Sequence, residues 1–459
     1  MTDNTKIEFV NHASILITHN DLGILSDPWY FSSIFNKGWR LLYENEIDYI
    51  EEVLSKTSHI YLSHEHPDHF NPKFLLEKKI KELILKKNIT FIFQKTRDKR
   101  VINFLKKNNF NVKECELDKK IYLADQITIK ISKHDFYDSS LSIFTPSYKI
   151  LNLNDCPLKD ISEIQSFKKL HGEYDLLLTQ FSYAAWKGSE ENTKLRKLAA
   201  DEKINSIISQ AKILNCKYII PFASYVYFSN KMNFYMNDSV NKPDTVYKAL
   251  KENNLNPIIM APKEIQSLKS ISQNQDSLSF WSDQFNNLSN GKKQIDMYDS
   301  SIKLKDLQLS FLEYQKKLYK KNSKLLILIL SKLSFLNIFQ DIYIFLEDHN
   351  KNYKFSIFNG LNETQNKNYD ISMHSDSLFF IFKNEFGFDT LTVNGCFQTQ
   401  SDKFPRVTKT LALGSLNAMG LGLNYKILLN IEIIFLFLKK VYSFFKKLRT
   451  TEILSYEKK

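Results

Sequence analysis

The stretch HIYLSHEHPDHFNP, residues 59–72, decides the fold of this chain. It begins as an apolar strand and then places four potential metal ligands within six residues, at His64, His66, Asp68 and His69. His64 and His66 are two residues apart, so an extended backbone points both side chains to one face. The turn at Pro67 can bring Asp68 and His69 towards a second ion. The loop therefore predicts a site for one or two divalent metal ions: zinc or iron, with manganese as a further candidate.

The alternative interpretation is a polar surface loop that is rich in histidine by chance. Only 10 of the 459 residues are histidine, so three of them within six positions favour the metal site. Asn71 and Pro72 suit the cap and the first position of a helix that follows the loop. The order strand, loop, helix gives the rigid frame that such a site needs.

Short strand patterns alternate with helical patterns up to about residue 265. The predicted strands are residues 7–10, 14–18, 23–26, 59–63, 89–94, 127–132, 141–145, 148–154, 175–180 and 217–222. Helices are predicted over residues 72–87 and 192–214. Two β-layers covered by helices satisfy this order, so residues 1–265 are interpreted as one α/β catalytic domain.

The remaining chain changes character. Residues 266–299 are rich in Ser, Asn, Gln and Asp and are predicted to be a linker. Residues 300–420 are predicted to form a separate α+β module, with helices over 304–319 and 324–336 and strands over 342–346, 354–358 and 377–382. This module faintly resembles sterol-carrier-like domains, and a plain packing domain is the favoured alternative.

Two apolar segments raise the question of membrane contact. The run LLILIL, residues 325–330, is too short to span a bilayer and is predicted to be a buried helix. Residues 421–459 are predicted to form a basic amphipathic helix, which would suit peripheral contact with a membrane surface. An intramolecular docking helix explains the same pattern and is preferred, because charged residues interrupt any spanning length.

Composition limits the function classes. The chain is 43% hydrophobic with only 11 Gly and 10 Pro, which indicates a packed globular protein. Its net charge of +12 comes from lysines spread along the chain, so we expect no nucleic-acid partner and an acidic small-molecule substrate instead. The four cysteines lack a CxxC pair and no secretory signal is visible, which favours the cytoplasm, with membrane association as the alternative.

The pattern His64-x-His66-x-Asp68-His69 resembles the signature of the metallo-β-lactamase superfamily. NHAS at residues 11–14 and LSDPW at 25–29 resemble the branch that contains ascorbate-6-phosphate lactonase and N-acylphosphatidylethanolamine phospholipase D. DPW (27–29), GWRLL (38–42), ILNLNDC (150–156) and PFASY (221–225) are similar to the metallo-β-lactamase-fold part of CMP-N-acetylneuraminate hydroxylase, over roughly residues 5–260. The resemblance implies an αββα sandwich with the metal site at one edge, between the two sheets.

The resemblance also implies roles for further residues. His134 stands where the next ligand histidine of the family is expected, and Asp155 where the family has the carboxylate that bridges two metals. The final family histidine, expected after the strand at 217–220, is absent, which leaves a complete second metal site open. His12 and Asp27 are interpreted as supporting residues, because metal-bound imidazoles usually donate their other N–H to a neighbouring acceptor.

Three functions are compatible with these residues. The first is hydrolysis of an acidic or phosphorylated metabolite through a metal-bound hydroxide, with Asp68 as the catalytic residue that orients or deprotonates the water. The second is an iron oxygenase that resembles CMP-N-acetylneuraminate hydroxylase and acts on a nucleotide sugar. It would need a separate electron-transfer protein, because no cysteine has a histidine two or three residues later, as a Rieske centre requires. The third is a non-catalytic role in which the C-terminal module binds an apolar ligand or a membrane.

Substrate contacts are predicted from charge and aromatic character alone. Lys37, Arg40 and Lys187 are candidate anchors for an anion, and Arg40 could hold a phosphate or carboxylate with two hydrogen bonds. The aromatic residues Tyr183 and Trp186, together with Trp39, are candidates to line a sugar or base. Each could equally be a surface cation or a packing aromatic. The sequence gives no prediction of homo-oligomeric state.

Overall fold

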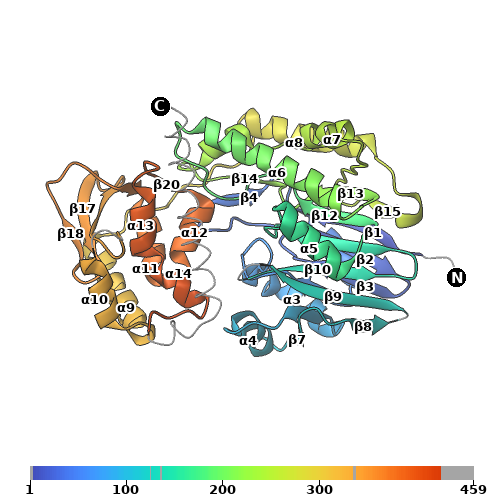
Figure 1. Cartoon of the computed structure of the whole chain (residues 1–459), viewed down its shortest axis with the longest axis horizontal. Coiled ribbons are helices and arrows are strands. Elements are labelled where there is room, and N and C mark those ends of the chain that lie inside the picture. Colours follow the sequence, from blue (N-terminus) through green and yellow to red (C-terminus); the bar gives the residue numbers. More distant parts are fainter. Residues whose placement is uncertain (1–3, 125, 135–136, 334–336, 425–459) are drawn as a thin grey trace, which may run out of the picture. The chain divides into compact units, whose positions relative to one another are not determined.

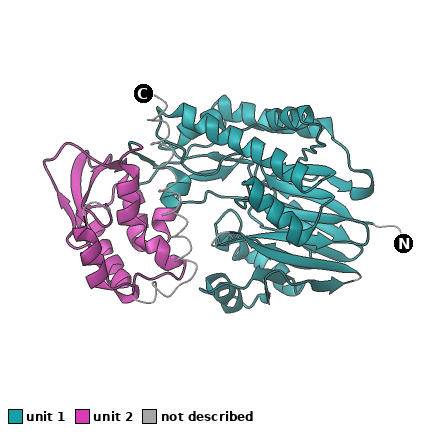
Figure 2. Ribbon diagram, viewed as in Figure 1, with its two compact units in different colours: residues 1–300, 390–400 teal, residues 301–389, 401–459 magenta. Residues whose placement is uncertain are grey.

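The computed structural model describes residues 4–124, 126–134, 137–333 and 337–424. The chain divides into two compact units, residues 1–300 with 390–400 and residues 301–389 with 401–459 (Figure 2). Most of the predicted C-terminal helix, residues 425–459, lies outside the described residues.

A seven-stranded sheet forms the first layer of unit 1, in the order β15-β1-β2-β3-β5-β6-β7 (Figure 1). Its strands are β1 (Lys6–Asn11), β2 (Ser14–His19), β3 (Leu22–Ser26), β5 (His59–Leu62), β6 (Thr90–Gln94), β7 (Asn111–Cys115) and β15 (Ile265–Ser267). The strands from β15 to β3 pair antiparallel, and those from β3 to β7 pair parallel. The histidine-rich loop therefore leaves the carboxyl end of a central parallel strand, β5.

The second layer is a six-stranded sheet in the order β13-β12-β11-β10-β9-β8. Its strands are β8 (Ile121–Ala124), β9 (Ile127–His134), β10 (Asp138–Phe144), β11 (Lys149–Asn154), β12 (Leu176–Gln180) and β13 (Tyr218–Phe222). β11, β12 and β13 run parallel, so their carboxyl ends lie at one edge of the sheet. A two-stranded ribbon of β4 (Trp39–Leu41) and β14 (Val226–Phe228) completes the β-structure of unit 1 apart from a short strand, β20 (Phe397–Gln398).

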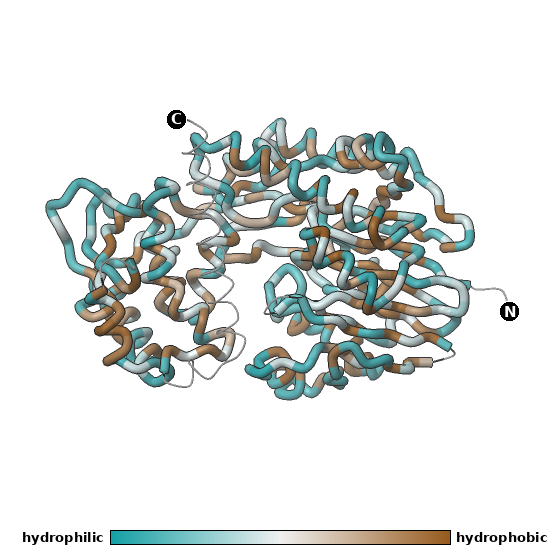
Figure 3. Tube along the Cα trace, in the orientation of Figure 1, coloured by the Kyte–Doolittle hydropathy of each residue, from teal (hydrophilic) through white to brown (hydrophobic). Residues whose placement is uncertain are grey.

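Helices cover the outer faces of both sheets. They are α1 (Ile47–Ser55), α2 (Pro72–Leu75), α3 (Lys78–Lys86), α4 (Arg100–Lys107), α5 (Ile161–His171), α6 (Thr193–Ile213), α7 (Pro243–Glu252) and α8 (Gln275–Ser289), with short 3-10 helices at Phe234–Ser239 and Leu268–Ser270. One apolar cluster joins the first sheet to α1, α3 and α4, and a larger one joins the two sheets to each other and to α5–α8. Apolar residues run along the strands of both layers (Figure 3). The predicted α/β class, with two β-layers between helices, is confirmed.

Unit 1 differs from its predicted boundary. The segment expected to be a linker, residues 266–299, contains α8, in which Trp281 is fully buried and its ring stacks 3.8 Å from the ring of Tyr225. The apolar residues Trp281, Phe285 and Leu288 recur at helical spacing. Because many polar residues lie between them, the overall composition of the segment resembles that of a loop. Unit 1 therefore extends to residue 300 and also includes residues 390–400.

Unit 2 contains a sheet with the order β18-β17-β16-β19 and the helices around it. Its elements are α9 (Leu304–Lys321), α10 (Lys324–Lys332), β16 (Ile342–Leu346), β17 (Lys351–Ser356), β18 (Gly360–Glu363), β19 (Ile371–Met373), α11 (Ser375–Lys383), α13 (Phe404–Leu411) and α14 (Leu413–Ala418), while α12 (Gly387–Asn394) crosses the boundary between the units. The strand predicted over 377–382 was wrong: α11 lies there, with Ser375, Ser377, Leu378, Ile381 and Phe382 buried at helical spacing.

The apolar run at 325–330 forms α10, but its predicted burial was wrong. Only Ile327 of this helix is buried, whereas Leu325 is 64% and Ile329 47% exposed. Consecutive apolar residues cover every face of a helix, and a nine-residue helix turns only one face to its unit. No helix among the described residues has the length and hydropathy needed to cross a membrane.

Candidate metal centre

The histidine-rich loop is fixed by the aspartate that ends the neighbouring strand. β3 and β5 are parallel neighbours, and Asp27 follows β3 directly. The backbone N–H of Ser63 donates to Oδ1 of Asp27 at 2.8 Å, and Oδ2 of Asp27 lies 3.0 Å from Nδ1 of His69. Asp27 is 1% exposed, so both contacts are shielded from water. The contact to Nδ1 leaves Nε2 of His69 available as a ligand, so Asp27 is placed where a supporting residue would stand.

The loop itself is a compact turn that leads into α2. The backbone N–H groups of His69 and Phe70 both donate to the carbonyl of His66, at 3.0 and 2.7 Å. The Asn71 side chain accepts from the backbone N–H of Phe74 at 3.0 Å, which caps α2 as the sequence predicts. Four ligand side chains are therefore held on a short backbone segment that is fixed by its own hydrogen bonds.

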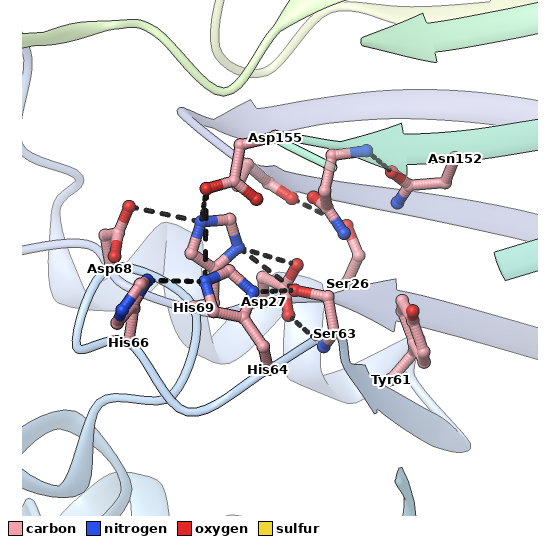
Figure 4. A network of polar contacts seen from close by, with 12 residues as sticks. Ser26, Asp27, Tyr61, Ser63, His64, His66, Asp68, His69, Asn152 and Asp155 are labelled. Atoms are coloured by element: carbon pink, nitrogen blue, oxygen red, sulfur yellow. Dashed lines mark hydrogen bonds and ion pairs between the residues drawn. The ribbon is translucent and has the colours of Figure 1, made fainter. Parts of the chain in front are cut away.

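Two groups of three side chains could each hold a metal ion. In the first group, His64, His66 and Asp155, one ligand atom of each residue lies within 4.8 Å of the others; the same holds for the second group, His12, Asp68 and His69. Figure 4 shows Asp155 above the rings of His64 and His69. Oδ2 of Asp155 is 3.9 Å from Nε2 of His64 and 3.6 Å from Nε2 of His69. Asp155 thus lies between the two groups, where a bridging carboxylate would stand.

His12 enters the second group from the turn between β1 and β2. Its Nε2 lies 3.5 Å from Oδ2 of Asp68, which is itself 3.1 Å from Nε2 of His69. The turn is held by Asn11, whose side chain accepts from the His12 backbone N–H at 2.8 Å, and by Ala223, whose N–H donates to the His12 carbonyl at 2.7 Å. The sequence suggested only a supporting role for His12, and no local pattern around it indicated that it meets Asp68.

The contact with Ala223 is informative because of where that residue lies. Ala223 follows β13, at the position where the resemblance leads one to expect a final histidine and where this chain has PFASY. The turn that carries His12 packs against this segment. The chain has no histidine directly after β13, and His12, whose turn packs against that segment, supplies an imidazole to the second group instead.

Burial and neighbouring charge set the protonation of the ligands. Burial lowers the pKa of His64 to about 3, so its imidazole is neutral at neutral pH, as a metal ligand must be. Burial alone would raise the pKa of Asp68, but the attraction of His69 and the contacts with His12 and His69 hold it well below the usual range. Burial likewise acts against the lowered pKa of Asp155, and His69 and His64 outweigh it. Both carboxylates are therefore ionised.

Several buried atoms of the site have no hydrogen-bond partner within the described parts of the chain. They are both ring nitrogens of His12, Nε2 of His69, Oδ1 of Asp68 and Oδ1 of Asp155. A buried polar atom without a partner costs about 1–3 kcal/mol. A cation placed between these nitrogen and oxygen atoms would satisfy them, and imidazole with carboxylate is a donor set that suits zinc or iron. The residues present therefore fit a metal centre.

His134, predicted to be a ligand, is in neither of the two groups that the described residues form. His134 ends β9, and its Nε2 lies 2.8 Å from Oγ of Ser140. Its ring lies 5.5 Å from the ring of Phe167 on α5, in the helical layer outside the sheet. Side chains alternate between the faces of a strand, so a resemblance in order and spacing did not decide which face His134 occupies.

Asp138 is an acidic residue near the first group that the sequence analysis did not single out. It begins β10, and its Oδ1 lies 4.0 Å from Nε2 of His64. A carboxylate therefore approaches the first group where a third histidine was expected. Asp138 lies only four residues after His134, and this proximity was the one hint in the sequence. The local pattern did not distinguish Asp138 from an acidic residue on the surface.

Two of the predicted anion anchors are paired with carboxylates. Arg40 donates two hydrogen bonds to Asp296, from Nε at 2.7 Å and from Nη2 at 2.9 Å. Lys37 contacts Asp299 at 2.6 Å. Both interactions lie within unit 1 and join the β4 region to residues 296–299. Both cations thus already have carboxylate partners within unit 1, and their role in binding substrate stays a prediction.

The predicted aromatic wall is divided in the same way. Tyr183 is 3% exposed and donates its hydroxyl to the carbonyl of Met236, and Trp39 is 1% exposed. These two rings belong to the core. Trp186 packs 4.8 Å from the ring of Phe397, and its backbone N–H donates to Thr392. Lys187 follows it and is half-buried, so it remains a candidate for substrate binding.

Two stacked sheets between helical layers, with an H-x-H-x-D-H loop leaving β5 and an aspartate directly after β11, are a metallo-β-lactamase fold that carries a candidate metal centre. More particularly, the chain is distantly related to the metallo-β-lactamase-fold part of CMP-N-acetylneuraminic acid hydroxylase. The histidine and aspartate groups are consistent with zinc or iron.

The hydroxylase of Asterias rubens is 39% identical over 66 residues, which are 14% of this chain and 10% of that protein. The Mus musculus hydroxylase is 24% identical over 254 residues, 52% of this chain and 42% of that protein. The chain thus spans about half or less of the length of the curated relatives it matches. Among solved structures, a metallo hydrolase of Ignicoccus hospitalis covers 58% of this chain and all of its own, with 15% identity and a TM-score of 0.42. No family model matches the chain.

Proposed function

We propose that the protein is a metal-dependent hydrolase that acts on an acidic or phosphorylated small molecule. The observation that carries this proposal is the pair of adjacent ligand groups with Asp155 between them. Two cations held there would supply a water of lowered pKa and a Lewis acid for a carbonyl or phosphoryl oxygen. The remaining roles fall to side chains of the chain itself.

Asp68 is proposed to orient the attacking water. Its Oδ2 faces His69 and His12, whereas its Oδ1 is buried and accepts no hydrogen bond from the described residues. A lowered pKa keeps the carboxylate ionised, so Oδ1 is suited to accept a hydrogen bond from water in the site. Asp27 holds the ring of His69 in position behind it.

Hydrolysis is preferred because it needs nothing besides the metal, water and substrate. An oxygenase requires dioxygen and two electrons for each turnover. Cys115, Cys156, Cys216 and Cys396 lack the histidine spacing of a Rieske centre, so this chain offers no electron donor of that kind.

A second candidate is an iron-dependent hydroxylase, and the distant relationship to hydroxylases favours it. Each ligand group contains two histidines and one carboxylate, the donor set found in non-haem iron oxygenases. Dioxygen would then be split between a hydroxyl group on the substrate and one water, with two electrons and two protons from a separate electron-transfer protein. A nucleotide sugar is the substrate class proposed for this candidate.

The two candidates are separated by metal content and by the reaction catalysed. The protein is purified anaerobically, and bound metals are measured by elemental analysis in wild type, His66→Ala, Asp155→Asn and the control Asp175→Asn, whose carboxylate belongs to neither ligand group. Hydrolysis of a phosphodiester and of a lactone is then compared with dioxygen uptake in the presence of a chemical reductant. Two zinc or manganese ions and turnover without dioxygen support hydrolysis; iron and substrate-dependent dioxygen uptake support hydroxylation. Wild-type protein without stoichiometric metal would contradict both.

A further inference from the structure

Lys203 lies at the edge of unit 1 that carries the metal centre, and the charge of Lys187 acts on it. Lys203 is on α6, and its ammonium group donates a hydrogen bond to Oε1 of Gln180. Gln180 is the last residue of β12, which runs parallel to β11, and the register pairs Asn154 with Thr179. Asp155 and Gln180 each follow one member of that pair, so Lys203 is held beside the strand end that carries Asp155.

Neither Lys203 nor Lys187 has a carboxylate within ion-pair distance among the residues that the structure describes. Both are half-buried. Glu202, whose charge acts on both lysines, is already paired with Lys159 at 2.6 Å. This differs from Lys37 and Arg40, whose charges are matched by Asp299 and Asp296.

Burial and neighbouring positive charge both act on the two lysines. Burial lowers the pKa of Lys203, and repulsion from Lys187 lowers it further, while the attraction of Asp155 acts in the opposite direction. Burial also lowers the pKa of Lys187. Cations in the metal groups would add more positive charge on the side of Asp155. An anion placed between the lysines and the metal centre would relieve this repulsion.

We infer that Lys203 and Lys187 form a subsite for an oxyanion of the substrate, a phosphate or a carboxylate. Gln180 is the positioning residue, because its side-chain oxygen accepts from the Lys203 ammonium group and fixes it beside Asp155. The inference rests on the proposed function in one respect: the anion is taken to belong to the molecule that reacts at the metal centre. The two lysines would supply the positive charge that selects an acidic substrate.

The test measures binding of inorganic phosphate, and in parallel of succinate, to the full-length protein by titration calorimetry. The variants are Lys203→Gln, Lys187→Gln and the control Lys197→Gln, which removes an exposed lysine from the same helix. Titrations are run with metal-loaded and with metal-depleted protein, and metal content is measured separately. A hydrogen bond to a charged group contributes about 1.5–3 kcal/mol, so each site variant is expected to weaken binding roughly 10- to 100-fold. The control is expected to stay within about twofold of wild type.

The oxyanion whose affinity falls in the site variants identifies the preferred chemistry. Equal affinities in wild type, Lys203→Gln and Lys187→Gln would overturn the inference, and so would an equal loss in Lys197→Gln, which would indicate only a general field. Unchanged metal content in these variants is expected, because neither lysine belongs to a ligand group. If wild type binds no metal, the proposed function fails, while the metal-depleted titrations still decide whether the lysines bind the anion.

Discussion

Replacing His12 by alanine tests whether this residue is a metal ligand or a packing residue. Its side chain is 2% exposed, and neither ring nitrogen has a hydrogen-bond partner in the described chain. If His12 only packed, its removal would lower the free energy of unfolding of the metal-free protein. If it is a ligand, the metal-free variant loses little, because two orphaned nitrogen atoms are removed from the interior along with the ring contacts.

The expected loss of metal affinity can be worked from the second group. A structural zinc site with four ligands binds with about 10–16 kcal/mol, or roughly 2.5–4 kcal/mol for each ligand. Loss of one ligand from His12, Asp68 and His69 should therefore weaken this site about 100- to 1000-fold. At saturating metal, the stabilisation by that ion falls by roughly 3–4 kcal/mol.

The assay combines metal analysis after dialysis with chemical denaturation in the presence and absence of zinc. We expect His12→Ala to retain one equivalent where wild type retains two, with metal-free unfolding almost unchanged. His59→Gln is the control, since His59 is half-buried on β5 and contacts Ser58 instead of the ligand groups. Two equivalents in His12→Ala, together with a less stable metal-free protein, would refute the assignment.

Three further outcomes follow from the structure. His134→Gln should keep the full metal content. Burial lowers the pKa of His134 to about 4 in the folded protein, below the 6.5 of an unfolded histidine. The stability that the neutral imidazole contributes is therefore complete above pH 6.5 and is lost as the pH falls towards 4. Denaturation at a series of pH values should show this loss reduced in the variant by at most about 3 kcal/mol, and loss of metal would restore His134 as a ligand. Arg40→Met leaves the carboxylate of Asp296 buried without its partner and should destabilise the protein by about 3–5 kcal/mol in urea denaturation, without a change in phosphate affinity of the protein that remains folded. Trp281→Ala should cost about 3–5 kcal/mol by the same measurement, and a change below 1 kcal/mol would mean that residues 266–299 are the linker their composition suggests.

The sequence was sufficient where ligands are neighbours along the chain. His64, His66, Asp68 and His69 lie within six residues. The strand before them and the capped start of the helix after them were both predicted from the sequence. Asp155 was placed by resemblance at the end of a predicted strand, and β11 ends at Asn154 as expected. Local spacing and strand periodicity act over a few residues, so they can be recognised without a structure.

Composition misled where a polar segment carries a sparse apolar stripe. The stretch 266–299 has the residues of a loop, yet Trp281, Phe285 and Leu288 are buried on one side of α8. Conversely, the continuous apolar run of α10 suggested a core helix, but Leu325, Leu328 and Ile329 are exposed and only Ile327 is buried. Burial depends on which face meets a neighbour, and composition does not specify the neighbour.

The amino-acid sequence by itself determined that this chain has an α/β fold and a metal-binding loop after β5. Only the tertiary structure decided which distant residues complete the site: it brings His12 to Asp68, turns His134 away, and places Lys203 beside the end of β11. The physical reason is that these contacts depend on the order of strands in the two sheets and on the face to which each side chain points. Both are fixed by packing between elements far apart in the sequence, and no local pattern records them.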